Sequence, residues 1–144
     1  MQFLRKLTFA AAIASAAFTG LAVVQPAHAS GSGKTTEVRI ETKLAGGAIG
    51  GVTPEGSARI RNRGTSSEFD VEVEHVNLPD ATKLTVAVMH GTVSTTVGTL
   101  TLKLHEGELE LNSRDGDLVP AVQVGDIIIV SDATNTPLLT GVLK

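Results

Sequence analysis

Period-two alternation of apolar and polar residues is the feature that most constrains this chain. From Glu37 to Leu44, the residues Val, Ile, Thr and Leu alternate with Arg, Glu and Lys. Successive side chains of a strand point to opposite faces of a sheet, so this pattern predicts a strand with one buried face. After residue 34 no stretch of twelve residues shows a 3.6-residue repeat. The pattern therefore predicts an all-β sandwich or barrel.

Turns rich in Gly, Pro, Asn and Asp divide the chain into seven to nine expected strands. These include the segments 57–63, 68–76, 83–90 and 138–143. Ile127–Val130 is apolar at every position, which is typical of a strand covered on both faces. We expect a single domain over residues 37–144 that folds as an antiparallel two-sheet β-sandwich of the immunoglobulin-like type.

Residues 1–29 have the three parts of a secretory signal peptide, which we expect to be helical. A short basic start ends at Lys6, and the segment Leu7–Val24 is apolar and uncharged. Small residues at Ala27 and Ala29 fit the positions that a signal peptidase reads. A retained membrane anchor is the alternative, because the apolar run is close to the length that spans a bilayer.

Cleavage before Ser30 leaves a Gly- and Ser-rich segment, residues 30–36, which we expect to be a flexible linker. The mature protein is then secreted or periplasmic and has no membrane partner. Without the two basic residues of the leader, ten Lys and Arg stand against fifteen Asp and Glu, a formal charge of −5. This acidic balance argues against nucleic acid as a partner.

The absence of three residue types excludes several kinds of site. The chain has no Cys, Trp or Tyr, so disulfides, thiolate metal sites, Cys nucleophiles and stacked aromatic sugar platforms are excluded. Phe69 is the one aromatic residue after the leader. Its parity on the predicted strand places it in the core.

Two neighbouring segments predict a charged ladder on one face of a hairpin, with three arginines opposite three carboxylates. Across a four-residue turn at Gly64–Ser67, the expected pairs are Arg63 with Glu68, Arg61 with Asp70 and Arg59 with Glu72. We interpret the ladder as a solvated face whose charges neutralise each other and specify the register. The alternatives are a charged recognition surface or a carboxylate cluster that binds a cation.

A second hairpin is expected at the turn Glu106-Gly107, with Lys103 opposite Glu110. The Thr-rich segment Val93–Val97 carries no charge that would block pairing with another strand. It is therefore the candidate for self-association through a sheet edge.

Metal binding has two candidate sites in the sequence. Asn112, Asp115 and Asp117 supply oxygen donors that suit calcium, although the loop lacks the register and the final Glu of an EF-hand. His90 together with carboxylates is the transition-metal candidate. The parity of their strands places His75 and His90 inward, whereas His105 lies outward beside a turn. Ordinary turn or rim roles explain all of these residues, and no other cofactor is expected.

The sequence contains no Gly-x-Ser-x-Gly elbow or other local catalytic motif. Hydrolysis needs a nucleophile, a base and an oxyanion hole that converge, and nothing in the spacing of the Ser and His residues indicates this. We therefore expect a non-enzymatic protein, with a small hydrolase as an alternative.

Several short segments together resemble the CHRD domain. They are Lys43–Gly46, Gly56–Ile60, Phe69–Val73, Val76–Leu78, Val86–Gly91, Val124–Val130 and Pro137–Leu143. The resemblance implies a β-sandwich in an exported or extracellular protein. CHRD proteins commonly have a paired His where His90 stands alone here, and another His in the strand that corresponds to Ile127–Val130. Any metal role that the family's histidines suggest does not carry over.

These observations together predict an exported, non-catalytic binding or structural module of the cell envelope or extracellular space. Its partner is an envelope component, another protein or a second copy of the chain. A calcium- or transition-metal-binding module is the first alternative.

Overall fold

The computed structural model describes residues 36–144. The expected signal peptide and nearly all of the expected linker lie outside the described residues. Eight strands form the fold: β1 Glu37–Ala45, β2 Glu55–Arg63, β3 Ser66–Glu74, β4 Lys83–His90, β5 Val93–Thr101, β6 Gly107–Asn112, β7 Ile127–Ser131 and β8 Pro137–Val142. No helix within the described range is long and apolar enough to cross a membrane.

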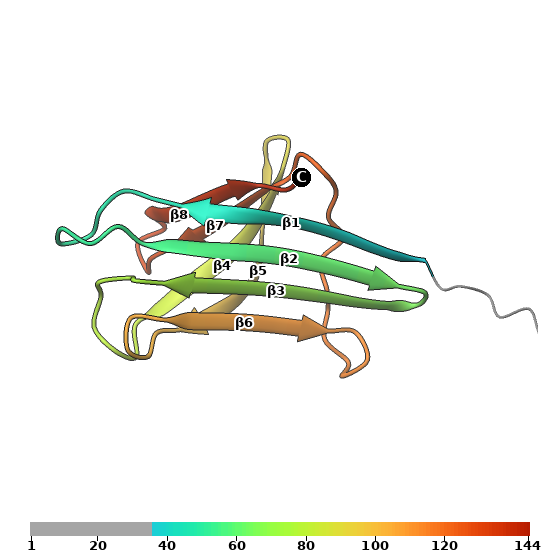
Figure 1. The fold of residues 1–144 in the computed structure, drawn as a ribbon, viewed down its shortest axis with the longest axis horizontal. Coiled ribbons are helices and arrows are strands. Elements are labelled where there is room, and N and C mark those ends of the chain that lie inside the picture. The colour runs from blue at the N-terminus through green and yellow to red at the C-terminus, as the bar shows by residue number, and fades with distance from the viewer. Residues whose placement is uncertain (1–35) are drawn as a thin grey trace, which may run out of the picture. The chain divides into compact units, whose positions relative to one another are not determined.

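The eight strands are hydrogen-bonded into one antiparallel sheet with the order β5-β4-β7-β8-β1-β2-β3-β6. The all-β prediction is confirmed, whereas a division into two separate sheets is not. The sheet bends between β8 and β1, so that β1, β2, β3 and β6 lie in front of β4, β5, β7 and β8 (Figure 1). Two four-stranded halves thus face each other within a single, nearly closed sheet.

The junction of the two halves, where β8 meets β1, depends on two glycines. Ala45 and Thr140 are the one pair in register there. A side chain at Gly46 would collide with the backbone carbonyl of Leu138, and one at Gly141 would collide with the carbonyl of Lys43. Because glycine has no Cβ, the backbones of the two strands can approach closely enough for the sheet to turn.

The apolar core lies between the two halves. Ile60, Phe69 and Val71 of the front half are at most 1 % exposed, and so are Leu84 and Ile128 of the back half. These side chains belong to one continuous cluster of buried residues. Phe69 is 0 % exposed, which confirms its predicted place in the core.

Candidate functional site

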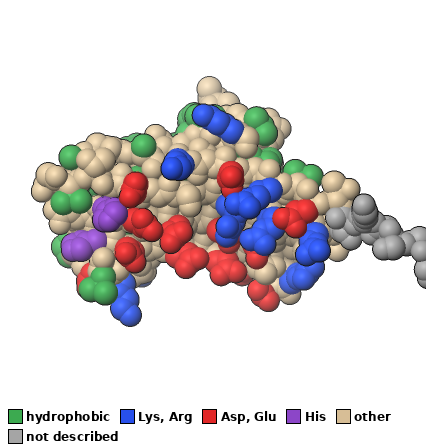
Figure 2. All heavy atoms as spheres, viewed as in Figure 1, with side chains coloured by type: hydrophobic (Ala, Val, Ile, Leu, Met, Phe, Trp, Pro, Cys, Tyr) green, Lys and Arg blue, Asp and Glu red, His purple; other side chains and the backbone are tan. Residues whose placement is uncertain are grey.

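The outer face of β1, β2, β3 and β6 carries most of the charged side chains of the described chain. Basic residues predominate on the outer face of β2. The outward acids of β3 and β6 are Glu68, Asp70, Glu72, Glu74, Glu108 and Glu110. Figure 2 shows a group of arginine and lysine side chains beside a band of acidic ones. The face therefore has a basic part and an acidic part.

The arginine ladder forms, but its register differs from the predicted one by two residues. The observed pairs are Arg63 with Ser66, Arg61 with Glu68 and Arg59 with Asp70. The predicted pairing of Arg63 with Glu68, Arg61 with Asp70 and Arg59 with Glu72 is wrong. The cause is the turn, which contains only Gly64 and Thr65. Gly64 has a φ of 61°, as a tight two-residue hairpin turn requires.

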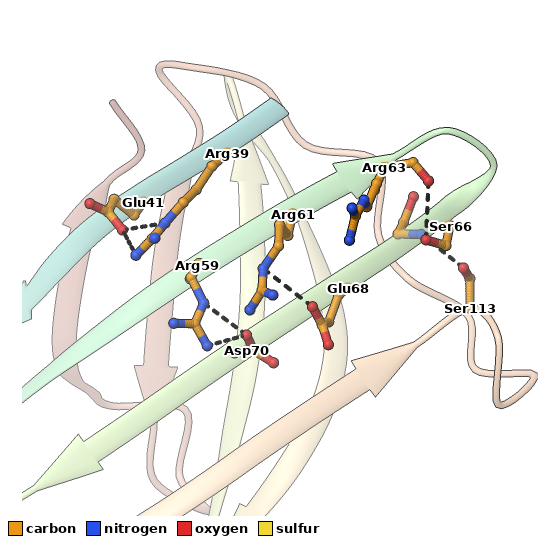
Figure 3. Close-up of polar contacts among 10 residues, drawn as sticks. Arg39, Glu41, Arg59, Arg61, Arg63, Ser66, Glu68, Asp70 and Ser113 are labelled. Atoms are coloured by element: carbon orange, nitrogen blue, oxygen red, sulfur yellow. Dashed lines mark hydrogen bonds and ion pairs between the residues drawn. The ribbon is translucent and has the colours of Figure 1, made fainter. Parts of the chain in front are cut away.

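Two arginines of the ladder contact carboxylates on β3 (Figure 3). Nη2 and Nε of Arg59 donate to Oδ2 of Asp70 at 2.7 and 3.0 Å. Nε of Arg61 lies 3.4 Å from Oε2 of Glu68. The hydrogen bonds to Asp70, together with its negative charge, raise the pKa of Arg59 above its usual value despite some loss of solvation. Within residues 36–144, Arg63 and Glu72 form no ion pair within 4 Å.

Strand β6 lies beside β3 instead of pairing with β5. The expected hairpin with Lys103 opposite Glu110 is wrong, because the turn is formed by Leu104 and His105. The backbones of Lys103 and Glu106 bond across this turn at 2.8 and 3.1 Å. The chain then crosses to β3, where β6 adds a strand to the front half.

This placement of β6 changes the charge balance of the face. Glu110 lies opposite Asp70, and Glu108 lies opposite Glu72. Like charges directly opposite each other are unfavourable on a sheet. The charge neutralisation that was predicted for the ladder is therefore limited to the contacts of Arg59 and Arg61. The outer surface of β3 and β6 carries an excess of negative charge.

Two groups of potential metal ligands lie on this face, each with donor atoms within 4.8 Å of one another. One consists of Glu68, Asp70 and Glu110. The other consists of Glu55, Glu74 and His75. The sequence offered a cation-binding carboxylate cluster on the ladder as an alternative, and Glu68 and Asp70 belong to that ladder. Glu110 and the whole second group were not predicted, because β6 was expected to pair with β5 and Glu55 lies before the expected strand.

The second group exists because His75 breaks the alternation of β3. His75 has a φ of 57°, and its side chain is 60 % exposed. The prediction that His75 faces inward is therefore wrong. Both Glu74 and His75 point outward, and Val76 is the next residue to enter the core, at 0 % exposure.

His90 forms a pair with a buried aspartate. Nδ1 of His90 lies 2.7 Å from Oδ1 of Asp126, whose side chain is 4 % exposed. Oδ2 of Asp126 accepts a hydrogen bond from the backbone N–H of Gln123 at 3.0 Å. Strand parity predicted that His90 faces inward, yet its side chain is 66 % exposed. The one sequence feature that could have pointed to this pair is the position of Asp126 directly before the apolar strand β7.

Of the predicted calcium ligands, Asn112 ends β6, and Asp115 and Asp117 lie in the loop that follows. Oδ1 of Asn112 accepts a hydrogen bond from the N–H of Arg114, and Oδ2 of Asp117 accepts one from the N–H of Asn112, both at 3.0 Å. Asp115 is exposed between them. The contact of Asn112 is that of an ordinary Asx turn, and the contact of Asp117 closes the same loop. Calcium binding stays a prediction.

The described residues thus present four features with functional potential. They are the polarised outer face, the Glu55, Glu74 and His75 group, the His90–Asp126 pair, and the end strand β5 of the sheet. Comparisons with family models, with curated proteins and with solved structures found no match to this chain.

Proposed function

We propose that this chain is an exported, non-catalytic binding or structural module of the cell envelope or extracellular space, which associates with a second copy through β5. The observation that supports the proposal is the open edge of β5. This strand ends the sheet, where it bonds to β4 on one side only. Its nine residues include no charged residue and no Pro.

The free part of the edge is the first half of β5. Residues 93–96 are all exposed, and Val93 is 64 % exposed. A bulge at Val86/Ala87 of β4 separates this half from the second, where Gly98 packs against Leu109 of β6. The turn between β4 and β5 projects beyond the neighbouring strands (Figure 1). Backbone N–H and C=O groups along the first half are therefore accessible to another strand.

A second copy suits this edge because two identical strands pair antiparallel about a two-fold axis. In that arrangement the Ser and Thr side chains of one β5 meet those of the other. Natural edge strands usually carry Lys or Pro to prevent such pairing. The first half of β5 has neither, so nothing in it opposes pairing with a second copy.

The non-catalytic part of the proposal is supported by the surroundings of His90. A buried carboxylate that orients a histidine supplies two of the three members of a hydrolytic triad. Within residues 36–144, the hydrogen-bonding partner of His90 is Asp126, and no Ser or Thr hydroxyl is bonded to its ring. This lack of a bonded nucleophile supports the non-catalytic proposal, and a small hydrolase remains the alternative function.

The export and family parts of the proposal are supported by the sequence. The leader-like residues 1–29 and the absence of Cys fit an exported protein. The two facing halves of the sheet are compatible with a CHRD-like sandwich, in which the bend at β8–β1 would separate the two layers.

The test is the oligomeric state of the purified protein, measured by light scattering and sedimentation over a hundredfold range of concentration. We expect a reversible dimer in the wild type and a monomer in Ser94→Lys and Thr96→Lys, since a charge on the edge blocks pairing. Thr140→Lys places the same charge on β8, an interior strand of the sheet, and should still dimerise. A wild type that is monomeric at every concentration, or β5 variants that dimerise normally, would contradict the proposal.

A further inference from the structure

We propose that Glu55, Glu74 and His75 form a binding site for a divalent transition-metal ion of the zinc and copper class. Nδ1 of His75 lies 3.2 Å from Oε1 of Glu55. Two ligands of a tetrahedral zinc ion, each about 2.0–2.1 Å from the metal, are about 3.3–3.5 Å apart. With all three donors within 4.8 Å of one another, side-chain rotation alone brings them to coordinating distance.

The backbone holds the three residues in place. Glu55 begins β2 and Glu74 ends β3, and the two are directly opposite in the antiparallel register. Their side chains therefore leave the sheet on the same face. The left-handed backbone at His75 turns its ring to that face as well, instead of into the core. Two ligands are thus a directly opposed pair at the end of the β2–β3 hairpin, and the third is His75, the residue directly after β3.

Within the described residues, no arginine forms an ion pair with the donors of this group, in contrast to the group of Glu68, Asp70 and Glu110. Two of the three carboxylates in the Glu68, Asp70 and Glu110 group already contact arginines of β2. Within the described residues, the ion pair of Glu55 is the contact with His75 itself. A cation therefore has no arginine to displace at Glu55. Lys43 lines the same pocket as Glu55 and Glu74, but within the described residues it forms no ion pair within 4 Å of either.

The ligand set indicates the class of metal. One imidazole nitrogen with two carboxylates suits zinc or copper(II), whereas calcium takes six to eight oxygen ligands. The side chains of His75 and Glu55 are 60 % and 65 % exposed, so an ion enters directly from solvent. Three protein ligands leave at least one coordination position for water. This site is independent of the β5 edge and of any association through it.

The experiment is titration calorimetry of the full chain with zinc chloride, together with electron paramagnetic resonance of the copper(II) complex. The informative variants are Glu55→Gln, which removes one carboxylate, and His75→Asn, because Asn tolerates a left-handed backbone. The matched controls are Glu72→Gln on the same face and His90→Gln at the other histidine. Circular dichroism and thermal unfolding show whether each variant is folded.

We expect one zinc ion per chain in the wild type and in both controls. Loss of even a supporting residue at a metal site costs about 10–100-fold in affinity, so either ligand variant should weaken zinc binding at least about tenfold. The copper spectrum should show coupling to a single nitrogen, which disappears in His75→Asn. The proposal is overturned if the wild type binds neither metal, if folded ligand variants bind like the wild type, or if His90→Gln abolishes binding.

Discussion

Five described residues other than glycine have a left-handed backbone: His75, Ala81, Leu104, His105 and Asn135. Each such residue costs of the order of 1–3 kcal/mol, so the surrounding contacts must hold it. At Leu104 and His105 they do. The N–H of Leu104 donates to Oδ1 of Asp80 at 2.8 Å, and the carbonyl of His105 accepts from Val76 at 3.0 Å. The corner that presents His75 is thereby tied to the turn between β5 and β6.

The carboxylate of Asp132 should make the stability of the fold depend on pH in the acidic range. Its Oδ1 accepts hydrogen bonds from the hydroxyl of Thr134 at 2.7 Å and from the N–H groups of Thr134 and Thr136 at 2.8 and 2.9 Å. These bonds, chiefly the one from the Thr134 hydroxyl, lower the pKa of Asp132 below its ordinary value of 3.8. A lowered folded-state pKa stabilises the fold above the unfolded pKa, and the stabilisation is lost as the pH falls.

We therefore predict that Asp132→Ala lowers the Tm at pH 7 and that its difference from the wild type shrinks as the pH falls below about 4. Thermal unfolding monitored by circular dichroism between pH 7 and pH 2.5 measures this. Asp115→Ala, in another exposed turn, is the control and should leave the Tm nearly unchanged. A difference between Asp132→Ala and wild type that is constant with pH would show that the carboxylate charge is unimportant.

At the scale of elements, β2 and β3 are joined by pairs of unequal strength. Arg59 donates two hydrogen bonds to Asp70, whose side chain is only 15 % exposed. Arg61 and Glu68 are 3.4 Å apart and are 37 % and 28 % exposed. Because exposed pairs contribute about 0.2–1 kcal/mol, we expect the Arg59–Asp70 pair near the top of this range and the Arg61–Glu68 pair near the bottom.

Double-mutant cycles with alanine at each pair, measured by urea unfolding, test this order. The coupling energy should be about 1 kcal/mol for Arg59 and Asp70 and at least twofold smaller for Arg61 and Glu68. Both couplings should fall when salt is added, since the pairs are partly exposed. An equal or larger coupling at Arg61–Glu68 would contradict the geometric argument.

Strands were easier to predict than their registers. The bounds of β4, Lys83–His90, agree with the sequence pattern, and the apolar run at Ile127–Val130 became β7 in the interior of the sheet. For β2 and β3, alternation specifies which face each side chain occupies, but a shift of two residues preserves both faces. Both registers also place arginines opposite carboxylates. Only the length of the turn at Gly64 separates them, and composition does not specify it.

The candidate metal site could not have been predicted, because it depends on a left-handed backbone at His75. Such a backbone is uncommon in residues other than glycine, and although His adopts it more often than Leu does, the sequence around His75 and Leu104-His105 has no further signal for it. The sequence pattern also did not predict that β6 pairs with β3, because the two strands are far apart in the chain. The local alternation of apolar and polar residues therefore predicted the all-β class and the strand positions. The composition of the candidate site depends on pairing between strands that are distant in the chain.

At the scale of the whole molecule, the junction of β8 with β1 decides whether the two halves close on the core. We predict that Gly141→Ala destabilises the fold by about 1–3 kcal/mol in urea unfolding, because its Cβ would collide with Lys43 and Leu44. Gly47→Ala is the matched control, since a Cβ there meets nothing within 4 Å. It should change stability by less than about 1 kcal/mol. Equal effects of the two variants would show that close approach at the junction is unimportant.

The same junction has a consequence for the time course of folding. Among the described strands, β8 is the last in the chain, yet it links β7 to β1, the first. Before β8 is in place, β1, β2 and β3 can form a local meander, but their apolar face lacks the other half of the core. Contacts between distant segments form slowly, so the slowest step should be the docking of β7 and β8. A chain that is still being made therefore lacks a complete core until those last strands emerge.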